Sequence, residues 1–500
     1  MHDDQQVVRL QQLDKSLMAG QFPVRWVEDL GFGMGYPLFN FYPPFTYYLG
    51  EVFHLVGFSF IDSIKMVWFV ALVGSALAMY LLTRNLLASI VYLYAPYHAI
   101  DAYVRGALAE LFSFVWLPLI LHFSLRNRPI LTGVLLGLLM ITHNLVFLPF
   151  TGILLLWSLF WGSKYFFRSC ISLAISFFLT AFFWLPSLVE KQFTLVDQLL
   201  IRNLASYKIH FLCLSQLWWG QWGFGGSVPG CADGLSFALG KLAFIFIFGG
   251  FLVTLSKRSK LGLISLILLC FSLFMTLPYS QFVWDRIPPL WYLQFPWRFL
   301  EFAALFTAVL AGLLRSRILV IALIPLIIFV NAKYFKPQQY LPQATDELLT
   351  SDQNVKWNIS SSSFEYMPSG VVTYVNDRGV VWVDINQEQV KSQKSKVKIN
   401  GGDVIQQEFT PDRFTLVGNF WQNASVQFNI TNFPGWKVWV DGKEIPINDN
   451  NKYKLITVDV EPGDHRIAGK FAGTLVRTIG NIISLVTLVC LGVALWKQRK

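Results

Sequence analysis

The chain has 500 residues, of which 54% are hydrophobic and 14% charged, and its formal net charge is +10 at pH 7. The hydrophobic share exceeds the about 45–50% of a soluble domain, and the excess gathers in runs of about 15–22 residues, long enough to cross the ~30 Å hydrocarbon layer as helices. Basic residues cluster in short loops beside these runs and no RNA- or DNA-binding motif is present, so the positive charge indicates membrane orientation and excludes nucleic acid as a partner.

Residues 1–42 form a polar, acidic and aromatic stretch before the first long apolar run. The stretch contains the adjacent carboxylates Asp3 and Asp4. Such a pair suits a general base that accepts a hydroxyl proton, a ligand pair for a divalent cation, or simply a solvated chain terminus. Further on, Arg25 and Trp26 precede a glycine- and aromatic-rich segment. Its backbone N–H groups and ring faces suit a sugar, or an interfacial loop anchored by aromatic side chains.

The apolar runs predict about 11 spanning helices. One further apolar segment, residues 43–57, is short and carries Glu51 and His54. If this segment does not cross the membrane, the basic loops all fall on the cytoplasmic side, whereas crossing would place several of them outside. We therefore interpret it as an interfacial helix. The expected spans are 62–83, 86–100, 106–124, 129–143, 145–161, 166–186, 237–255, 260–277, 299–314, 317–331 and 475–496.

This arrangement describes a multi-pass protein of the plasma membrane with a cytoplasmic C-terminus. Residues 1–61, 101–105, 187–236, 278–298 and 332–474 then lie outside. An external N-terminal loop requires a helix before it that leads the chain outward. We therefore expect Met1 to be an internal start that gives an N-terminally truncated product.

The composition turns polar toward the C-terminus, and apolar residues there alternate with polar ones. Ile456, Val458 and Val460 share one face of a predicted half-buried strand. Asp441-Gly442 between two apolar runs predicts a hairpin turn. Several such strands indicate an external antiparallel β-sandwich. The predicted domains are an external loop with interfacial helices (1–61), a transmembrane domain (62–331), the β-sandwich (340–472) and a C-terminal transmembrane helix (475–496).

Ionisable residues at membrane depth are functional candidates by default. Asp101, Arg105 and Glu110 lie at the outer end of two predicted helices, where they point into a cavity or form an interfacial ion pair. His143 lies near the outer end of another helix, a position that also suits a purely structural histidine. Arg298 lies at the outer entry of a further helix. Its planar guanidinium matches phosphate oxygens, and the same position suits an arginine that snorkels to the interface.

The five cysteines show no CxxC or metal-ligand spacing. Two of them, Cys213 and Cys231, share one predicted external loop. They suit a disulfide if that loop is extracytoplasmic, and the alternative is two unpaired small residues.

Several segments, taken in chain order, carry a resemblance to known proteins. They are HDDQQVVR, GQFPVRWVEDLGFGMGYPLFNFYPP, APYHAIDAYVRGALAE, THN, QLWWGQWGFGGSVPG, FPWRFLEF, FEYMPSG and GWKVWVDGK. Together they resemble the bacterial 6-pyruvoyl-tetrahydropterin-synthase-related membrane proteins, a YfhO-like family. Pterin synthase activity is not implied, because that soluble enzyme uses a three-histidine zinc site and the seven histidines here offer no H-x-H.

The layout also resembles the C-type (GT-C) membrane glycosyltransferases. Those enzymes carry a catalytic acidic residue in the first external loop, interfacial helices after it and often an external C-terminal β domain, and they use polyprenyl-phosphate-linked sugars. By this resemblance Asp3 or Asp4 is the catalytic carboxylate. Arg105 and Arg298 are then expected to bind the phosphate of the lipid donor, and a divalent cation remains an open cofactor. The substrate-binding candidates are Arg25, Trp26, Asp101, Arg105, Glu110, His143 and Arg298.

The chain is therefore expected to transfer a sugar from a polyprenyl-phosphate donor to an acceptor at the outer membrane face. The alternative is a non-catalytic protein of lipid or polymer transport or of cell-envelope assembly on the same scaffold. Such a protein needs phosphate-binding arginines and a groove but no carboxylate, so the acidic pair distinguishes the two functions.

Overall fold

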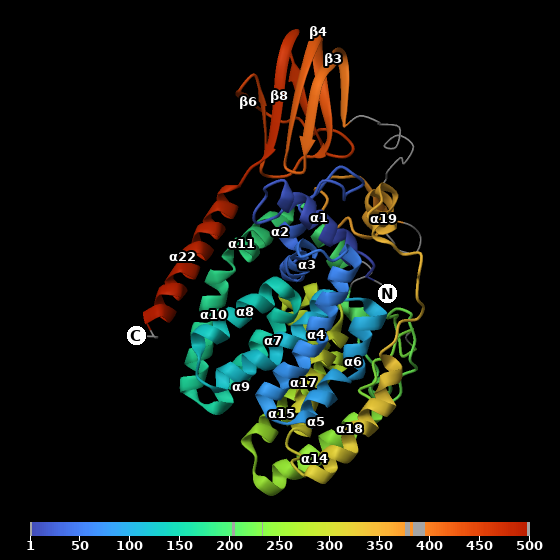
Figure 1. Cartoon of the computed structure of the whole chain (residues 1–500), viewed down its shortest axis with the longest axis vertical. Coiled ribbons are helices and arrows are strands. Elements are labelled where there is room, and N and C mark those ends of the chain that lie inside the picture. The colour runs from blue at the N-terminus through green and yellow to red at the C-terminus, as the bar shows by residue number, and fades with distance from the viewer. Residues whose placement is uncertain (1–2, 203–205, 233, 376–380, 384–395, 498–500) are drawn as a thin grey trace.

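The computed structural model describes residues 3–202, 206–232, 234–375, 381–383 and 396–497. Helices form the body of the molecule, and an antiparallel sheet projects from one end of it (Figure 1). The N-terminal helices lie at the same end as the sheet, whereas α14 (Lys241–Lys257) and α18 (Arg317–Asn331) lie at the opposite end (Figure 1).

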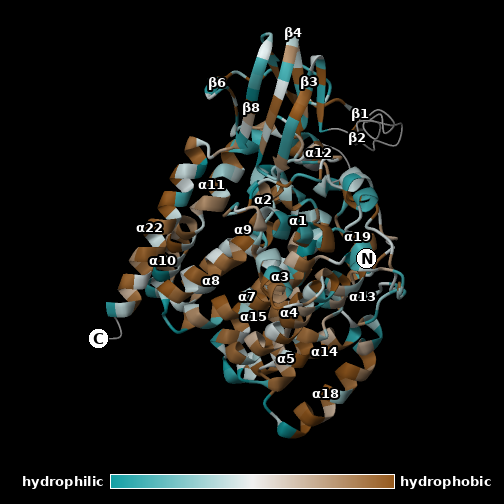
Figure 2. Cartoon of the chain, turned by 45° about the horizontal axis from the view of Figure 1, so that its top comes forward, coloured by the Kyte–Doolittle hydropathy of each residue, from teal (hydrophilic) through white to brown (hydrophobic). Residues whose placement is uncertain are grey.

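Several helices are long and apolar enough to cross a membrane. In the described part of the chain there are five, and up to seven if each of two bent helix pairs forms one span. The first bent pair is α10 (Ser163–Leu179) with Ala181–Phe193, which contains α11 (Ala181–Glu190), at 72°. The second is α15 (Lys260–Thr276) with Pro278–Arg286, which contains α16 (Gln281–Arg286), at 92°. Figure 2 shows the apolar residues concentrated on the helical body. The five single helices are α4 (Phe60–Thr83), α7 (Leu108–Leu125), α9 (Asn144–Trp161), α18 with the turn that extends it to Tyr334, and α22 (Leu475–Lys497).

These helices support the prediction of a multi-pass membrane protein, but the predicted number of spans stays a prediction. The expected span 86–100 is interrupted, because Pro96 disfavours helical backbone at the residue before it. The chain there forms α5 (Leu86–Leu93), α6 (Pro96–Ala99) and a π-helical turn (Ile100–Arg105). Two further expected spans form shorter helices, α8 (Pro129–Thr142) and α17 (Leu300–Ala311).

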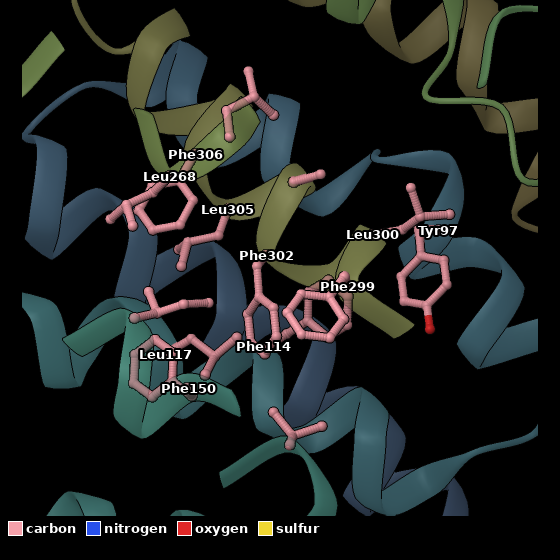
Figure 3. Close-up of a cluster of buried hydrophobic side chains, with 14 of the residues drawn as sticks. Tyr97, Phe114, Leu117, Phe150, Leu268, Phe299, Leu300, Phe302, Leu305 and Phe306 are labelled. Atoms are coloured by element: carbon pink, nitrogen blue, oxygen red, sulfur yellow. The ribbon is translucent and has the colours of Figure 1, made fainter. Parts of the chain in front are cut away.

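The core of the helical body surrounds α17, which is buried along all its 12 residues. A helix that is apolar on every side belongs inside a bundle. Its side chains Leu300, Phe302, Leu305 and Phe306 pack among Phe114 and Leu117 of α7, Phe150 of α9 and Leu268 of α15 (Figure 3). The α17 helix therefore fixes the positions of the helices that carry the candidate site.

The apolar segment 43–57 forms α3 (Phe45–Leu55), which has 11 residues. At about 1.5 Å per residue, such a helix is about 17 Å long, too short for the ~30 Å hydrocarbon layer. It packs between α1 (Gln6–Met18) and α4, and a Cβ on Gly50 would lie 3.3 Å from Leu10. This length agrees with the interpretation of α3 as a non-crossing helix.

Loops predicted for the same side of the membrane lie close together. Among the predicted external loops, the Tyr207 hydroxyl donates to Asp285 at 2.5 Å and the Trp222 ring lies 4.6 Å from Tyr334. At the opposite end, Asn85 Nδ2 donates to the carbonyls of Gly312 and Leu314 at 3.0 Å each. The predicted orientation relative to the cytoplasm stays a prediction.

The C-terminal strands form one six-stranded antiparallel sheet with β7 beside β4 and the order β3-β4-β8-β5-β6. The predicted Asp441-Gly442 hairpin is confirmed: φ is 49° at Asp441 and 83° at Gly442, as a two-residue turn between twisted strands requires. Ile456, Val458 and Val460 are buried, as their alternation predicted. The strands are β3 (Val397–Thr410), β4 (Arg413–Thr431), β5 (Trp436–Val440), β6 (Lys443–Ile445), β7 (Leu455–Val460) and β8 (Gly463–Phe471).

The sheet folds over on itself, which replaces the predicted sandwich of two separate sheets. The rings of Phe414 and Phe428, near the two ends of β4, stack with centroids 4.1 Å apart. A shift of register between Asn400 and Gly402 marks the bend in the neighbouring β3. The domain also begins later than residue 340. Short helices occupy that stretch, among them α19 (Asp346–Leu349), a π-helical turn (Asn354–Ile359) and α20 (Ser360–Ser362), and a small hairpin of β1 (Thr373–Val375) and β2 (Val381–Val383) follows.

A buried ion pair joins the β domain, α22 and the helical body. Glu190 at the end of α11 accepts from Arg477 Nε at 2.9 Å and from Arg477 Nη2 at 2.8 Å. Arg477 Nη2 also donates to the carbonyl of Pro434 in the β domain at 2.8 Å. Asn40 Nδ2 donates to Glu190 at 2.8 Å and so connects the N-terminal segment to the ion pair. We call this pair and its partners the Glu190 joint.

Cys213 and Cys231 form a disulfide with a Cα–Cα distance of 5.5 Å. It closes the loop around α13 (Leu214–Trp218), which follows α12 (Val196–Arg202). The structure therefore favours the first of the two interpretations of these cysteines.

Candidate functional site

A buried carboxylate gathers three of the predicted basic residues. Glu110 Oε2 lies 2.8 Å from Arg105 Nη2, 3.2 Å from Arg298 Nε and 3.7 Å from His143 Nε2. The Tyr97 hydroxyl donates to Glu110 Oε1 at 2.6 Å. These side chains come from α6, the π-helical turn, α7, the N-terminal cap of α9 and the turn before α17, and we call them the Glu110 cluster.

Two more carboxylates support this cluster. Asp101 is fully buried and accepts from Arg105 Nη1, and fully buried Glu301 accepts from the Ser113 hydroxyl. The basic side chains lie nearer the surface, with 12% of Arg105, 12% of Arg298 and 13% of His143 exposed. The buried carboxylates thus orient the basic groups, and only a small part of each basic side chain is accessible. Guanidinium groups in such a position suit the oxygen atoms of an anion at the accessible edge of the cluster.

A turn at Gly106 brings Arg105 and Glu110 together. Residues five apart do not face each other within one α-helix. Gly106 has φ 70°, which ends the π-helical turn and starts α7 in a new direction. The Arg105 guanidinium also lies over the Trp297 ring at 4.8 Å, which fixes its plane. The sequence places Arg105 and Glu110 at a junction between two helices, and the turn at Gly106 brings their side chains into contact.

Asp3 lies against the same turn. Its backbone N–H donates to the carbonyl of Arg105 at 2.7 Å. Gln6 Nε2 donates both to Asp3 Oδ2 at 2.8 Å and to the carbonyl of Gly106 at 3.0 Å. Burial raises the pKa of Asp3 above its ordinary value, although the positive charges of Arg9 and Arg105 oppose this shift. Asp3 is therefore held beside the cluster, whereas Asp4 is exposed.

Two charged residues beside Asp3 were not predicted from the sequence. Arg9 is 4% exposed, its Nη1 donates to the Tyr47 hydroxyl at 3.4 Å, and its guanidinium lies 4.0 Å from the Tyr42 ring centroid. Burial raises the pKa of Glu365, and the charge of Arg9 opposes the shift. The FEYMPSG segment that contains Glu365 was noted only as part of the family resemblance, because nothing local links it to residue 9.

Arg25 and Trp26 lie away from the Glu110 cluster. Arg25 donates to Asn40 Oδ1 at 2.9 Å and to the carbonyl of Phe182 at 2.8 Å, next to the Glu190 joint. Burial and the charge of Arg477 lower the pKa of Arg25 to about 10. Trp26 is 1% exposed and packs against Trp436 of the β domain at 5.4 Å. Both side chains hold the N-terminal segment in place, and a role in binding substrate stays a prediction for them.

Metal ligation was left open by the sequence. In the part of the chain that the structure describes, no three His, Cys, Asp or Glu side chains come together as metal ligands. Asp3 and Asp4 would need oxygen atoms from substrate or water to complete a coordination shell.

Comparison with known proteins does not indicate a function, so a proposal must depend on the geometry of the site. No protein-family model, no curated protein and no solved structure matches this chain.

Proposed function

We propose that this chain belongs with the 6-pyruvoyl-tetrahydropterin-synthase-related membrane proteins and that it is a membrane glycosyltransferase of the GT-C type, whose layout it resembles. It would transfer a sugar from a polyprenyl-phosphate donor to an acceptor at the outer membrane face. One observation carries the proposal: Asp3 is hydrogen-bonded to the turn that also holds Arg105 in the Glu110 cluster. The Asp3 carboxylate and the Arg105 guanidinium are thus held at the same turn.

Asp3 suits activation of the acceptor, and the arginines of the Glu110 cluster suit stabilisation of the leaving phosphate. Asp3 accepts the proton of the acceptor hydroxyl, whose oxygen forms a bond to the anomeric carbon of the sugar. The bond from that carbon to the phosphate oxygen breaks, and the phosphate leaves with the electron pair. Arg105 and Arg298 stabilise the departing phosphate through charge-assisted hydrogen bonds, and Glu110 keeps both arginines in position.

A small apolar cavity lies beside the Glu110 cluster. The cavity has a volume of about 30 Å³ and is lined by residues of α6, α14, α17 and α18. Tyr97 belongs both to this lining and to the Glu110 cluster, where its hydroxyl donates to Glu110. The cavity has room for a group of about the size of one water molecule, so the prenyl chain of a bound donor would have to lie outside it.

The direct test is a transfer assay with the full chain in detergent or liposomes. The donors would be undecaprenyl phosphate carrying radiolabelled glucose, mannose or arabinose, and the acceptors would be membrane extracts. Incorporation of label that depends on the protein supports the proposal. Binding of the donors without transfer from any of them would favour the alternative, a non-catalytic protein that handles lipid or polymer.

Arg298→Ala is expected to weaken donor binding and raise KM by about tenfold or more with a smaller change in kcat, because it removes one charge-assisted contact to the phosphate. Arg105 remains on Glu110 at 2.8 Å, so the carboxylate keeps a partner. Steady-state kinetics with varied donor concentration measure the effect. Lys164→Ala removes an exposed positive charge at the other predicted membrane face and is the control. Equal KM values for both variants would contradict a phosphate site at Arg298.

The proposed orientation places the C-terminus in the cytoplasm and the β domain outside. A reporter fused after Lys500 that is active only in the cytoplasm should therefore be active, and one active only outside should be silent. The opposite result would place the Glu110 cluster at the cytoplasmic face and would require a different donor.

A further inference from the structure

A cleft of about 450 Å³ lies where the β domain meets the helical body. One wall belongs to the β domain and carries Asn432, Lys437, Glu444, Asp449 and Lys454. The other wall contains Phe193, just after α11, and Ser369. These two residues are tied by a hydrogen bond from Ser369 N to Phe193 O at 2.8 Å. We call this space the β-domain cleft.

The charges of the cleft balance in pairs. Lys437 Nζ lies 3.1 Å from Glu444 Oε2, and Lys454 Nζ lies 3.6 Å from Asp449 Oδ1. Asn432 Nδ2 also donates to Asp449 Oδ2 at 3.0 Å. Such a lining offers donors and acceptors side by side without a net charge. It therefore suits a neutral ligand with many hydroxyl groups better than a phosphate, an acidic polymer or a metal cation.

An aromatic ring completes the lining. Phe193 is 41% exposed although it is fixed by the backbone pairing with Ser369, and its ring meets that of Phe433 edge-on at 6.5 Å. A flat apolar surface beside paired polar groups matches a sugar ring, which has an apolar C–H face and a rim of hydroxyl groups. Pockets for small ligands share this combination of aromatic surface and a few fixed polar groups.

The neighbouring sheet edge does not favour a peptide. β6 (Lys443–Ile445) forms the edge of the sheet beside the cleft, but it has three residues and is followed by Pro446. Proline lacks the N–H that a paired strand needs, and a short edge with lysine opposes strand addition. A glycan remains the better match to the lining.

We propose that the β-domain cleft binds a neutral oligosaccharide segment. If the proposed function holds, on which this step rests, the segment belongs to the acceptor or to its glycosylated product. Successive ring contacts lead from the cleft toward the segment of Glu365: Phe193 to Phe433 at 6.5 Å, Phe433 to Phe41 at 6.1 Å, and Phe41 to Tyr366 at 5.4 Å. These ring contacts thus reach from the cleft to Tyr366, whose neighbour Glu365 is close enough for the charges of Arg9 and Asp3 to act on it.

Binding of defined oligosaccharides to the detergent-solubilised full chain tests the proposal by calorimetry. The probes are maltohexaose, mannohexaose and N-acetylated chitohexaose, with a polygalacturonate hexamer as an acidic probe and an extended nine-residue peptide. At least one neutral hexamer should bind. Phe193→Ala and Lys437→Ala should each weaken that binding by about tenfold, because the first removes the aromatic surface for the sugar ring and the second removes a hydrogen-bond donor.

Trp421→Ala is the matched control, because this ring is 60% exposed elsewhere on the β domain. It should leave binding unchanged. Asp3→Asn should also bind like the wild type. If the wild-type protein binds the hexamer but transfers no sugar from any donor, the proposed function is refuted and the proposal for the cleft still stands. The proposal is overturned if no neutral hexamer binds, if both cleft variants bind as well as the Trp421 variant, or if the acidic probe or the peptide binds more tightly.

Discussion

Asp3→Asn is expected to lower kcat by about 10²–10⁴-fold, the usual cost of losing a positioned general base. The amide keeps the size of the carboxylate and still accepts from Gln6, so the hydrogen bonds to the Arg105 turn can persist. KM for the donor should change little, because Asp3 does not belong to the phosphate-binding group. Asp4→Asn is the matched control: it makes the same chemical change at an exposed position and should keep full activity.

The dependence of kcat on pH gives a second test of Asp3. Because burial raises the pKa of Asp3, its carboxylate is protonated at a higher pH than an ordinary aspartate, whose pKa is about 3.9. A base must be deprotonated to act, so wild-type kcat should fall with decreasing pH, and the fall should begin above the range of an ordinary aspartate. The remaining activity of Asp3→Asn should lack this step. If Asp3→Asn matches Asp4→Asn in rate and pH profile, Asp3 is not the base and the non-catalytic function is favoured.

Much of the charged cluster was predictable, because a charge beside an apolar run is costly and therefore stands out. Asp101, Arg105, Glu110, His143 and Arg298 were all selected on that basis, and the structure brings them together. Their pairing was not predictable. It depends on the turn at Gly106 and on the contact between segments nearly 200 residues apart, which no local pattern encodes.

Long-range contacts also explain why the roles of some charged residues could not be predicted from the sequence. The charge of Arg9 acts on Glu365 through space, although the two residues are 356 positions apart in the chain. Arg25 was predicted to bind substrate because the sequence does not show its contacts with Asn40 and with the distant residues Phe182 and Asn481. Burial of these polar groups is visible only once the tertiary structure is known.

The β domain shows the same division between local and long-range signals. The Asp441-Gly442 turn and the alternation around Val458 are local patterns, and both predictions are confirmed. The fold-over of the sheet depends on a bend within β4 that lets Phe414 stack on Phe428. The alternation of apolar and polar residues shows which face of a strand is buried. It does not show whether one long strand bends so that its two ends pack on opposite sides of the same core.

Glu190→Gln is expected to destabilise the junction of the β domain, α22 and the helical body by about 3–5 kcal/mol, the usual cost of breaking one partner of a buried ion pair. The variant leaves the buried charge of Arg477 without its carboxylate and close to the second buried charge of Arg25. The Arg477 side chain would then have to keep its remaining bonds to main-chain carbonyls or move toward solvent. Because Arg477 is 1% exposed, trypsin should cut after it only when the joint opens.

Limited trypsin digestion of the detergent-solubilised protein, followed by mass spectrometry of the C-terminal fragment, measures this opening. Glu190→Gln should release the fragment that begins after Arg477 faster than the wild type, and its thermal midpoint should fall. Glu444→Gln is the control, since it makes the same chemical change in an ion pair whose side chains are about half exposed, at 46% for Lys437 and 52% for Glu444. Exposed pairs contribute little to stability, so this variant should digest like the wild type. Equal digestion of the two variants would mean that apolar packing around α22, such as the contact of the Arg477 guanidinium with the Phe471 ring at 4.5 Å, holds the junction without the ion pair.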